Sequence, residues 1–409
     1  MFELRDYQEE ISGKAVDILK KYKIAYLQME VRTGKTFTSL STAQRYGAEK
    51  VLFITKKKAI QSILDDYKTG NYTFDFTVIN NESIHKLKDK YDFLISDEHH
   101  RNGGFPKPSE RTKLIKKMFS NLPIMFLSGT PNPESYSQIF HQYWISDYSP
   151  FKQYKNFYAW AKDFVNVTQK NYGYSNVNDY SDANYTKIEP LIKHLLFSYT
   201  KKQAGFVSTI NETIIDVEMQ PITYKIIKKL KDDKIVIGKE SEIIADTAVK
   251  LQNKIHQLCS GSVILESGKS VVIDDSKAIA IKTLFIGKKI GIFYKFKAEL
   301  DMIKNVFGDS VTTDLDEFNT TDKNIALQIL AGREGLSLKK AVSLVYFNID
   351  FSAISYFQSR DRMTTKDRTE SNIFWIFAKD GIERKIYQSV KLKKDYTLRM
   401  FRKEYELSN

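Results

Sequence analysis

Residues 24–36 read Ile-Ala-Tyr-Leu-Gln-Met-Glu-Val-Arg-Thr-Gly-Lys-Thr, and this stretch decides the fold of the first half of the chain. Ile24–Met29 is short and largely apolar, which is typical of a buried strand, and the glycine-containing loop after it opens a helix. Similar apolar runs recur at Val51–Thr55, Phe76–Ile79, Phe93–Ser96 and Ile124–Ser128. Short apolar runs separated by helical segments predict a parallel sheet in an α/β lobe.

A second α/β pattern occupies the C-terminal half. Its apolar runs are Ile290–Tyr294, Ile325–Leu330, Val342–Phe347 and Ile373–Ala378, and a long amphipathic helix is expected near Ser241–Cys259. Between the two patterns, Tyr, Asn, Lys and Asp dominate and apolar runs are sparse. We therefore expect an N-terminal lobe over residues 1–150, an insertion or linker segment over 151–210 and a C-terminal lobe over 211–409.

Composition limits the partners and the compartment. The 409 residues carry a formal net charge of +13, which favours a polyanionic partner such as nucleic acid. The alternative interpretation is a lysine-rich protein from an AT-rich genome. A single cysteine and six histidines exclude an internal disulfide and a zinc cluster of the usual spacing. The sequence has no apolar signal region and no long apolar run, so we expect no membrane association and a cytoplasmic location.

The loop after the first apolar run contains the kinds of group that bind a nucleoside triphosphate. A glycine lets the backbone approach phosphate oxygens, a lysine reaches the outer phosphates, and a hydroxyl binds magnesium. Gly34, Lys35 and Thr36 match these needs in order. The helix that begins here adds free N–H groups that favour an anion. The full pattern has a further glycine upstream, where this sequence has Met29.

A second motif follows the run Phe93–Ser96, where the sequence continues Asp97-Glu98-His99-His100. A carboxylate at the end of a strand can reach a magnesium ion on a neighbouring phosphate loop. A second carboxylate beside it can position or deprotonate the attacking water. The alternative interpretation of the two carboxylates is an acidic turn, which is common after a strand. The two histidines could also suggest a metal site, but adjacent side chains seldom bind one ion.

Together these residues resemble the motifs of the superfamily 2 helicases. In chain order, the resembling segments are Arg5–Gln8, Gly34–Thr36, Asp97–His100, Ser128–Pro131, Ile292–Lys297, Ala331–Leu338 and Gln358–Arg362. Asp97–His100 resembles the DEAH-type box. Within the superfamily, the chain looks most like the chromatin-remodeller type of translocase and its small phage relatives. The segments that carry this closer likeness are Leu195–Lys202, Ile214–Gln220 and Ile255–Gly261.

The resemblance implies two RecA-like lobes with an ATP cleft between them, and ATP and Mg²⁺ as cofactors. It gives catalytic roles to Lys35, Asp97 and Glu98, with Arg362 or Arg360 meeting the γ-phosphate. It implies metal contacts from Thr36 and Asp97. Nucleotide contacts are implied at Arg5, Gln8, Arg32, Thr33, Gly34, Lys35, Thr36 and Gly335. Nucleic-acid contacts are implied at Thr55, Lys56, Lys57, Asn81, Ser128, Gly129, Gly332 and Arg333. Where the sixth motif usually has a second arginine, this sequence has Thr365.

The expected function is that of an ATP-dependent DNA helicase or translocase that couples ATP hydrolysis to movement on nucleic acid or to its unwinding. DNA is favoured over RNA as the partner. Phage replication or recombination is suggested by size and composition alone, with the host cytoplasm and other replication or recombination proteins as its setting. Two alternatives stay open. One is a duplex DNA translocase that does not separate strands, and the other is a nucleic-acid binding module with a decayed ATPase. The oligomeric state is left open.

Overall fold

The fold is described from a computed structural model. The described residues are 3–30, 33–129, 132, 135–171, 176–200, 202–205, 209–238, 242–332, 338–360, 362 and 370–392. The chain forms two compact units, Met1–Gly205 and Phe206–Asn409, which are treated separately below.

Unit 1 is built on a six-stranded sheet in the order β3-β2-β4-β5-β1-β8, and all of its strand pairs are parallel. The strands are β1 (Ile24–Met29), β2 (Lys50–Thr55), β3 (Asp75–Asn80), β4 (Phe93–Ser96), β5 (Ile124–Leu127) and β8 (Leu196–Tyr199). The apolar runs of the N-terminal sequence therefore form strands, as predicted. Because every strand runs the same way, the loops after β1 and β4 emerge at one edge of the sheet.

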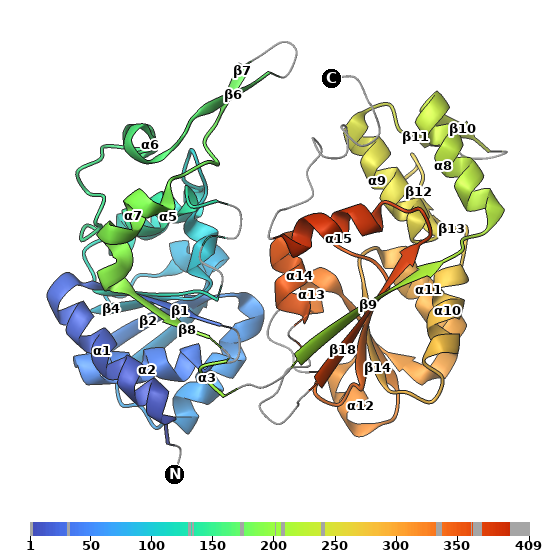
Figure 1. Cartoon of the computed structure of the whole chain (residues 1–409). Coiled ribbons are helices and arrows are strands. Elements are labelled where there is room, and N and C mark those ends of the chain that lie inside the picture. The colour runs from blue at the N-terminus through green and yellow to red at the C-terminus, as the bar shows by residue number, and fades with distance from the viewer. Residues whose placement is uncertain are drawn as a thin grey trace. The chain divides into compact units, whose positions relative to one another are not determined.

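Side chains that alternate along each strand supply two separate cores. On β1, Ala25, Leu27 and Met29 join one core, and Ile24 and Tyr26 join the other. The first core is covered by α1 (Asp6–Tyr22), α2 (Lys35–Tyr46) and α3 (Ile60–Thr69). The second is covered by α4 (Glu110–Phe119), α5 (Gln138–Trp144), α6 (Phe157–Phe164) and α7 (Tyr185–Ile192). Unit 1 is thus a three-layer α/β/α structure (Figure 1).

The segment 151–210 belongs to unit 1 as far as Gly205, and its last two residues begin β9 of unit 2. It provides α6, the antiparallel pair β6 (Thr168–Asn171) and β7 (Asn176–Asp179), α7, and the edge strand β8. Phe151, Phe157 and Trp160 are buried within the second core, so these aromatic side chains pack the lobe rather than offering surfaces for stacking bases. Short 3-10 turns lie at η1 (Lys57–Ala59), η2 (Asn81–Lys86), η3 (His99–Asn102) and η4 (Lys193–Leu195).

Unit 2 has a second six-stranded parallel sheet, in the order β15-β16-β14-β17-β18-β9. Its strands are β9 (Thr209–Val217), β14 (Ile290–Tyr294), β15 (Val311–Thr312), β16 (Asn324–Gln328), β17 (Ser343–Tyr346) and β18 (Glu370–Ala378). Its helices are α8 (Pro221–Asp233), α9 (Ala248–Cys259), α10 (Ser276–Leu284), α11 (Lys297–Phe307), α12 (Leu315–Thr320), α13 (Ile329–Gly332), α14 (Ala353–Arg360) and α15 (Glu383–Lys391). Two hairpins, β10 (Ile235–Ile237) with β11 (Glu242–Ile244) and β12 (Ser262–Ile264) with β13 (Ser270–Val272), and the turn η5 (Gly308–Ser310) complete it.

The predicted α/β class is confirmed, since each unit has a six-stranded parallel sheet flanked by helices. One predicted helix is shorter than expected. Residues 242–244 pair as β11, and the helix begins only at Ala248, where the Thr247 side chain accepts a hydrogen bond from the Lys250 N–H and caps it. Within the described part of the chain, no helix is both long and apolar enough to cross a membrane.

Candidate active site

The loop after β1 has the backbone geometry that the phosphate-loop prediction requires. Gly34 precedes α2 with φ +85°, in the left-handed region that favours glycine. A Cβ atom at this position would lie 2.1 Å from Nε2 of Gln8. Both the dihedral angle and the close approach therefore require glycine here. The N-terminus of an α-helix favours a bound anion, and α2 begins directly after Gly34.

Lys35 is the first residue of α2, and its ammonium group turns back over the end of β1. Its Nζ donates hydrogen bonds to the Met29 carbonyl at 2.7 Å and to the Glu30 carbonyl at 3.1 Å. Thr36 follows in the first turn and is half-buried. The loop thus holds the cation and the hydroxyl that the sequence predicted, next to each other at one sheet edge.

The acidic motif begins directly after β4. The Asp97 N–H donates to the Ile54 carbonyl at 2.9 Å, and the Thr55 hydroxyl donates to Asp97 Oδ2 at 2.8 Å. Glu98 has φ +49°, which is unusual for a residue with a side chain and marks local strain. The strained turn directs Glu98 to Lys56, with Nζ to Oε1 at 3.8 Å, and to His100, with Nδ1 to Oε2 at 3.4 Å.

The two neighbouring carboxyl groups differ in their titration. Burial, and then the negative charge of Glu98, raise the pKa of Asp97 to about 6. Burial also acts to raise the pKa of Glu98, but Lys56, His100 and Lys35 together hold that pKa below its ordinary value. Glu98 therefore stays ionised to a lower pH than Asp97, and the Asp97 carboxylate is the one whose charge a bound cation would stabilise.

The two histidines of the motif have different environments. His99 stacks on Phe126 with ring centroids 3.7 Å apart, and its ring nitrogens contact Ser96 Oγ and the Gln142 carbonyl. Burial lowers the pKa of His99 to about 3, so it is a neutral packing residue. His100 Nδ1 lies 2.9 Å from Ser128 Oγ, which joins the acidic motif to the segment after β5.

Gln8 is buried, and the structure uses both ends of its side-chain amide. Its Oε1 accepts from the Arg5 backbone N–H at 3.0 Å, which caps α1, and its Nε2 donates to the Gly34 carbonyl at 3.2 Å. Arg5 is exposed, and its Nη1 donates to the Tyr7 hydroxyl at 2.9 Å. Thr33 is buried, and its hydroxyl donates to the Glu30 carbonyl at 2.7 Å.

The residues predicted to contact nucleic acid differ in their exposure and in their hydrogen-bond partners. Thr55 and Ser128 are buried, and their hydroxyls are engaged by Asp97 and His100, so a contact to phosphate there needs backbone groups. Lys57 is exposed in η1. Lys56 lies beside Glu98, and the Asn81 amide donates to the Thr55 carbonyl. Gly129 is half-buried, and Gly332 ends α13.

In unit 2, the two candidate arginines have different surroundings. Arg360 Nη1 lies 2.9 Å from Oε1 of Glu212, in a side-chain cluster that also includes Tyr356. Arg362 is buried, and its carbonyl accepts from the Leu338 N–H at 3.1 Å. Arg32, Arg333 and Gly335 lie outside the described residues.

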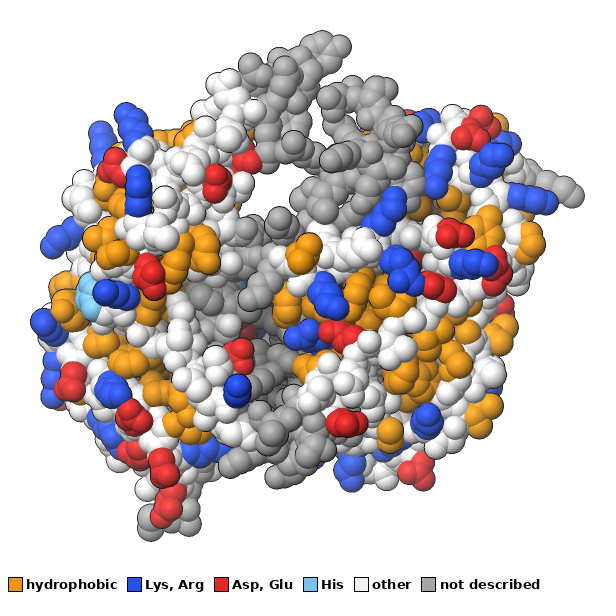
Figure 2. All heavy atoms as spheres, in the orientation of Figure 1, with side chains coloured by type: hydrophobic (Ala, Val, Ile, Leu, Met, Phe, Trp, Pro, Cys, Tyr) orange, Lys and Arg blue, Asp and Glu red, His pale blue; other side chains and the backbone are white. Residues whose placement is uncertain are grey.

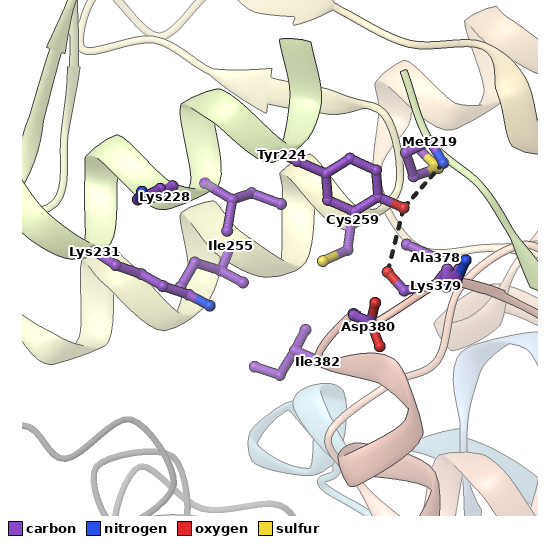
Figure 3. A pocket seen from close by; sticks show the side chains of 12 residues that line it. Met219, Tyr224, Lys228, Lys231, Ile255, Cys259, Ala378, Lys379, Asp380 and Ile382 are labelled. Carbon is purple, nitrogen blue, oxygen red and sulfur yellow. Dashed lines mark hydrogen bonds between the residues drawn. The ribbon is translucent and has the colours of Figure 1, made fainter. Parts of the chain in front are cut away.

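Unit 2 also contains a hollow of about 220 Å³ between α8, α9 and the end of β18. Its floor is apolar and includes Ile255, Ile382 and Cys259, whose pKa is raised by burial (Figure 3). The Tyr224 hydroxyl accepts from the Met219 N–H and donates to the Lys379 carbonyl. The residues that line this hollow lack the paired carboxylates and the glycine loop found in unit 1.

Some participating residues were not predicted in these roles. The sequence indicated Thr55 and Lys56 only as phosphate contacts, whereas the structure places them against Asp97 and Glu98. The sequence contained a signal for these roles, because Thr55 ends β2 and Lys56 follows it, and β2 is the neighbour of β4 in the sheet. The pair Tyr7–Tyr199 beside the loop, with stacked rings 4.5 Å apart, had no signal, since 192 residues separate its members.

Comparisons with known proteins agree with the N-terminal motifs. Residues 1–73 match the family model described as type III restriction enzyme, res subunit, which is of the superfamily 2 helicase type. No curated protein sequence matches the chain. Among solved structures, the chain is similar to the Sulfolobus solfataricus SWI2/SNF2 ATPase core in complex with dsDNA, at 13% identity and a TM-score of 0.44, over 100% of this chain and 95% of that one. The family match confirms the predicted superfamily 2 resemblance over the segment that carries Gln8 and Gly34–Thr36.

Proposed function

We propose that the protein is a nucleic-acid-dependent ATPase, an ATP-dependent DNA helicase or translocase. One observation carries the proposal. The positive charge of Lys35, at the start of α2, acts on both carboxylates after β4: it opposes the rise in the pKa of Asp97 and helps to hold the pKa of Glu98 below its ordinary value. ATP hydrolysis needs a phosphate-binding lysine and two carboxylates close together. Here they lie at one edge of the sheet, and the pKa of one carboxyl group is raised while that of the other is lowered.

The residues present fit Mg²⁺, which favours hard oxygen ligands and is usually held by one or two protein groups together with phosphates. Thr36 and Asp97 offer a hydroxyl and a carboxylate, and the described residues contain no group of three or more His, Cys, Asp or Glu side chains that could hold a metal alone. When bound, the ion would neutralise charge on the transferred phosphate. Thr55 would hold the Asp97 carboxylate in place through its hydroxyl.

The remaining residues divide the work of hydrolysis. Lys35 and the N–H groups of α2 would hold the outer phosphates. Glu98, kept ionised by Lys56 and His100, would position and activate the attacking water. His100 contacts Ser128, so a change at the carboxylates would reach the segment that resembles the third helicase motif. Arg362 or Arg360 remains the predicted partner of the γ-phosphate, and Gln8 with Arg5 the predicted contact to adenine.

Nucleic acid, with DNA favoured over RNA, is the proposed track. Lys and Arg side chains are spread over both units among Asp and Glu on the face that Figure 2 shows, rather than gathered in one patch. The support for a nucleic-acid partner is therefore the formal net charge of +13, which favours phosphate contacts, and such contacts carry little base specificity. A role in phage replication or recombination is part of the proposal and rests on size and composition alone.

The test is ATP hydrolysis with and without single-stranded DNA, duplex DNA, forked DNA and RNA. Glu98→Gln keeps the shape of the side chain and removes its charge, so hydrolysis should fall by about 10² or more. Glu110→Gln, an exposed glutamate in α4, is the matched control and should leave hydrolysis unchanged. Stimulation by one polymer, lost only in Glu98→Gln, supports the motor.

Strand displacement and triplex displacement, run side by side, then separate a helicase from a duplex translocase. A protein that binds DNA and hydrolyses no ATP with any polymer would contradict the proposal and leave a binding module with a decayed ATPase. Two features of the sequence favour that outcome: Met29 in place of the first loop glycine and Thr365 in place of a second arginine in the sixth motif.

A further inference from the structure

The end of β8 is attached to the phosphate loop through its backbone. Tyr199, the last residue of β8, pairs with Met29 in the sheet, and its carbonyl accepts a hydrogen bond from the Glu30 N–H at 3.0 Å. Met29 and Glu30 are also the residues whose carbonyls hold the Lys35 ammonium group. Tyr199 therefore borders the segment that positions the proposed phosphate-binding lysine.

The side chain of Tyr199 makes a second attachment. Its ring stacks on Tyr7 with centroids 4.5 Å apart and an interplanar angle of 17°. The Tyr7 hydroxyl in turn donates to the Thr33 carbonyl at 2.9 Å, directly before Gly34. The loop is thus fastened on one side by the backbone of Tyr199 and on the other by the Tyr199–Tyr7 stack.

Tyr199 also stands where the chain leaves the sheet toward unit 2. The next residue, Thr200, donates from its N–H to Gln203 Oε1 at 2.8 Å, and the Tyr199 hydroxyl donates to the Gln203 carbonyl at 3.0 Å. These bonds close a compact turn at the start of the connecting segment. The first described strand beyond it, β9, begins at Thr209.

We propose that Tyr199 is a positioning residue that links the connecting segment between the units to the phosphate loop. It holds the loop in the shape that binds phosphate, and it passes a displacement of the connecting segment to Glu30 and, through Tyr7, to Thr33. The expected effect on ATP binding rests on the proposed function. The positioning of the loop residues by Tyr199 does not depend on it.

The test compares Tyr199→Ala, Tyr199→Phe and Tyr7→Phe in the full-length chain. Removing a stacked ring pair leaves more loop conformations to be ordered on binding, so Tyr199→Ala should weaken the binding of a fluorescent ATP analogue by about three- to tenfold. KM for ATP should rise more than kcat falls. Tyr199→Phe keeps the stack and should bind within about twofold of wild type. Tyr7→Phe also keeps the stack but loses the hydroxyl that donates to the Thr33 carbonyl and accepts from Arg5, so its affinity should fall between those of the two Tyr199 variants.

Tyr136→Ala is the matched control. Tyr136 stacks on Tyr185 with centroids 4.4 Å apart, and Tyr185 packs against the core on the opposite face of the same sheet. Losing this stack should leave nucleotide binding unchanged. Equal effects of Tyr199→Ala and Tyr136→Ala on nucleotide binding would overturn the inference.

Amide hydrogen exchange around Glu30 and Thr33 gives a readout that needs no ATP. Exchange there should be faster in Tyr199→Ala than in wild type and unchanged in Tyr136→Ala. If wild type binds no nucleotide, the proposed function fails, while faster exchange in Tyr199→Ala still supports the hold on the loop. Unchanged exchange overturns the inference whether or not the protein is an ATPase.

Discussion

Arg360 Nη1 lies 2.9 Å from Oε1 of Glu212, and the same carboxylate accepts hydrogen bonds from Tyr356, Trp375 and Tyr387. Glu212 lies on the edge strand β9, whereas its donors come from α14, β18 and α15. The carboxylate therefore joins three elements of unit 2. Arg360, one of the two arginines predicted to meet the γ-phosphate, already has a structural partner inside its own unit.

Glu212→Gln should lower the free energy of unfolding by about 2–4 kcal/mol, because an amide replaces a carboxylate that serves four donors in a largely buried site. Urea denaturation of the variant measures the change. Arg384→Met, which breaks an exposed pair with Asp216, is the control and should change stability little. A Glu212→Gln protein as stable as wild type would show that the cluster is dispensable.

Asp97→Asn should stabilise the metal-free, nucleotide-free protein at high pH. The pKa of Asp97 in the folded protein, about 6, lies above the ordinary value of 3.8, so the folded state favours the protonated form. This favourable contribution is complete below pH 3.8 and is lost as the pH rises through 6. Asn needs no proton to be neutral. The free energy of unfolding of Asp97→Asn should therefore exceed that of wild type by up to about 3 kcal/mol near pH 8, and by less toward pH 4.

Thermal unfolding of wild type and Asp97→Asn across pH 4–8, with a chelator present, checks this prediction. The same variant should lose its response to Mg²⁺ and ATP. A stability difference that does not depend on pH would argue against the raised pKa of Asp97.

Gly34→Ala should be more destabilising than Gly47→Ala. Both glycines have left-handed angles, φ +85° and +83°, so each alanine stores backbone strain of about 1–2 kcal/mol. Only at Gly34 would the new Cβ also meet Gln8 Nε2, at 2.1 Å, whereas nothing lies within 4 Å at Gly47. Gln8→Ala in the Gly34→Ala background should recover part of the difference in melting temperature. Equal melting temperatures for the two single variants would contradict this.

Lys277→Met should cost about 3–5 kcal/mol of unfolding free energy. Lys277 Nζ lies 2.5 Å from Glu383 Oε1 with both side chains buried, so the substitution strands a carboxylate in an apolar core. The double variant Lys277→Met with Glu383→Leu should regain most of the loss, since no charge is then left buried. A double-mutant cycle by urea denaturation measures the coupling, and an additive result would exclude a direct pair.

Lys57→Ala with Lys58→Ala should weaken DNA binding equally for unrelated sequences. Both lysines are exposed in η1, and Lys57 is one of the residues predicted to contact nucleic acid. Loss of two phosphate contacts should reduce the steepness with which the logarithm of the DNA association constant falls with the logarithm of salt concentration, by about 2. Lys20→Ala with Lys21→Ala removes the same charge from the last turn of α1 and should leave the slope unchanged. Equal slopes for both pairs would place the DNA elsewhere.

Much of the fold was predictable because its signals are local. The run Ile24–Met29 and its counterparts are short, apolar and separated by helices, and burial on both faces of a parallel sheet demands such runs. Lys35, Asp97 and Glu98 could be predicted as site residues for the same reason, since Asp97 and Glu98 come directly after β4 and Lys35 follows β1 after a short loop. The start of α9 was misplaced because residues 242–244 form a strand only through pairing with Ile235–Ile237.

The sequence by itself thus determined the two parallel sheets and the residue types at the ends of their strands, because alternating burial and strand–loop–helix order act over a few residues. Only the tertiary structure decided which of these ends meet. Thr55 reaches Asp97 because β2 and β4 are neighbours, Tyr199 reaches Tyr7 because β8 lies at the edge beside β1, and Arg360 reaches Glu212 because α14 packs near β9. These contacts join residues far apart in the chain, and no local pattern records them.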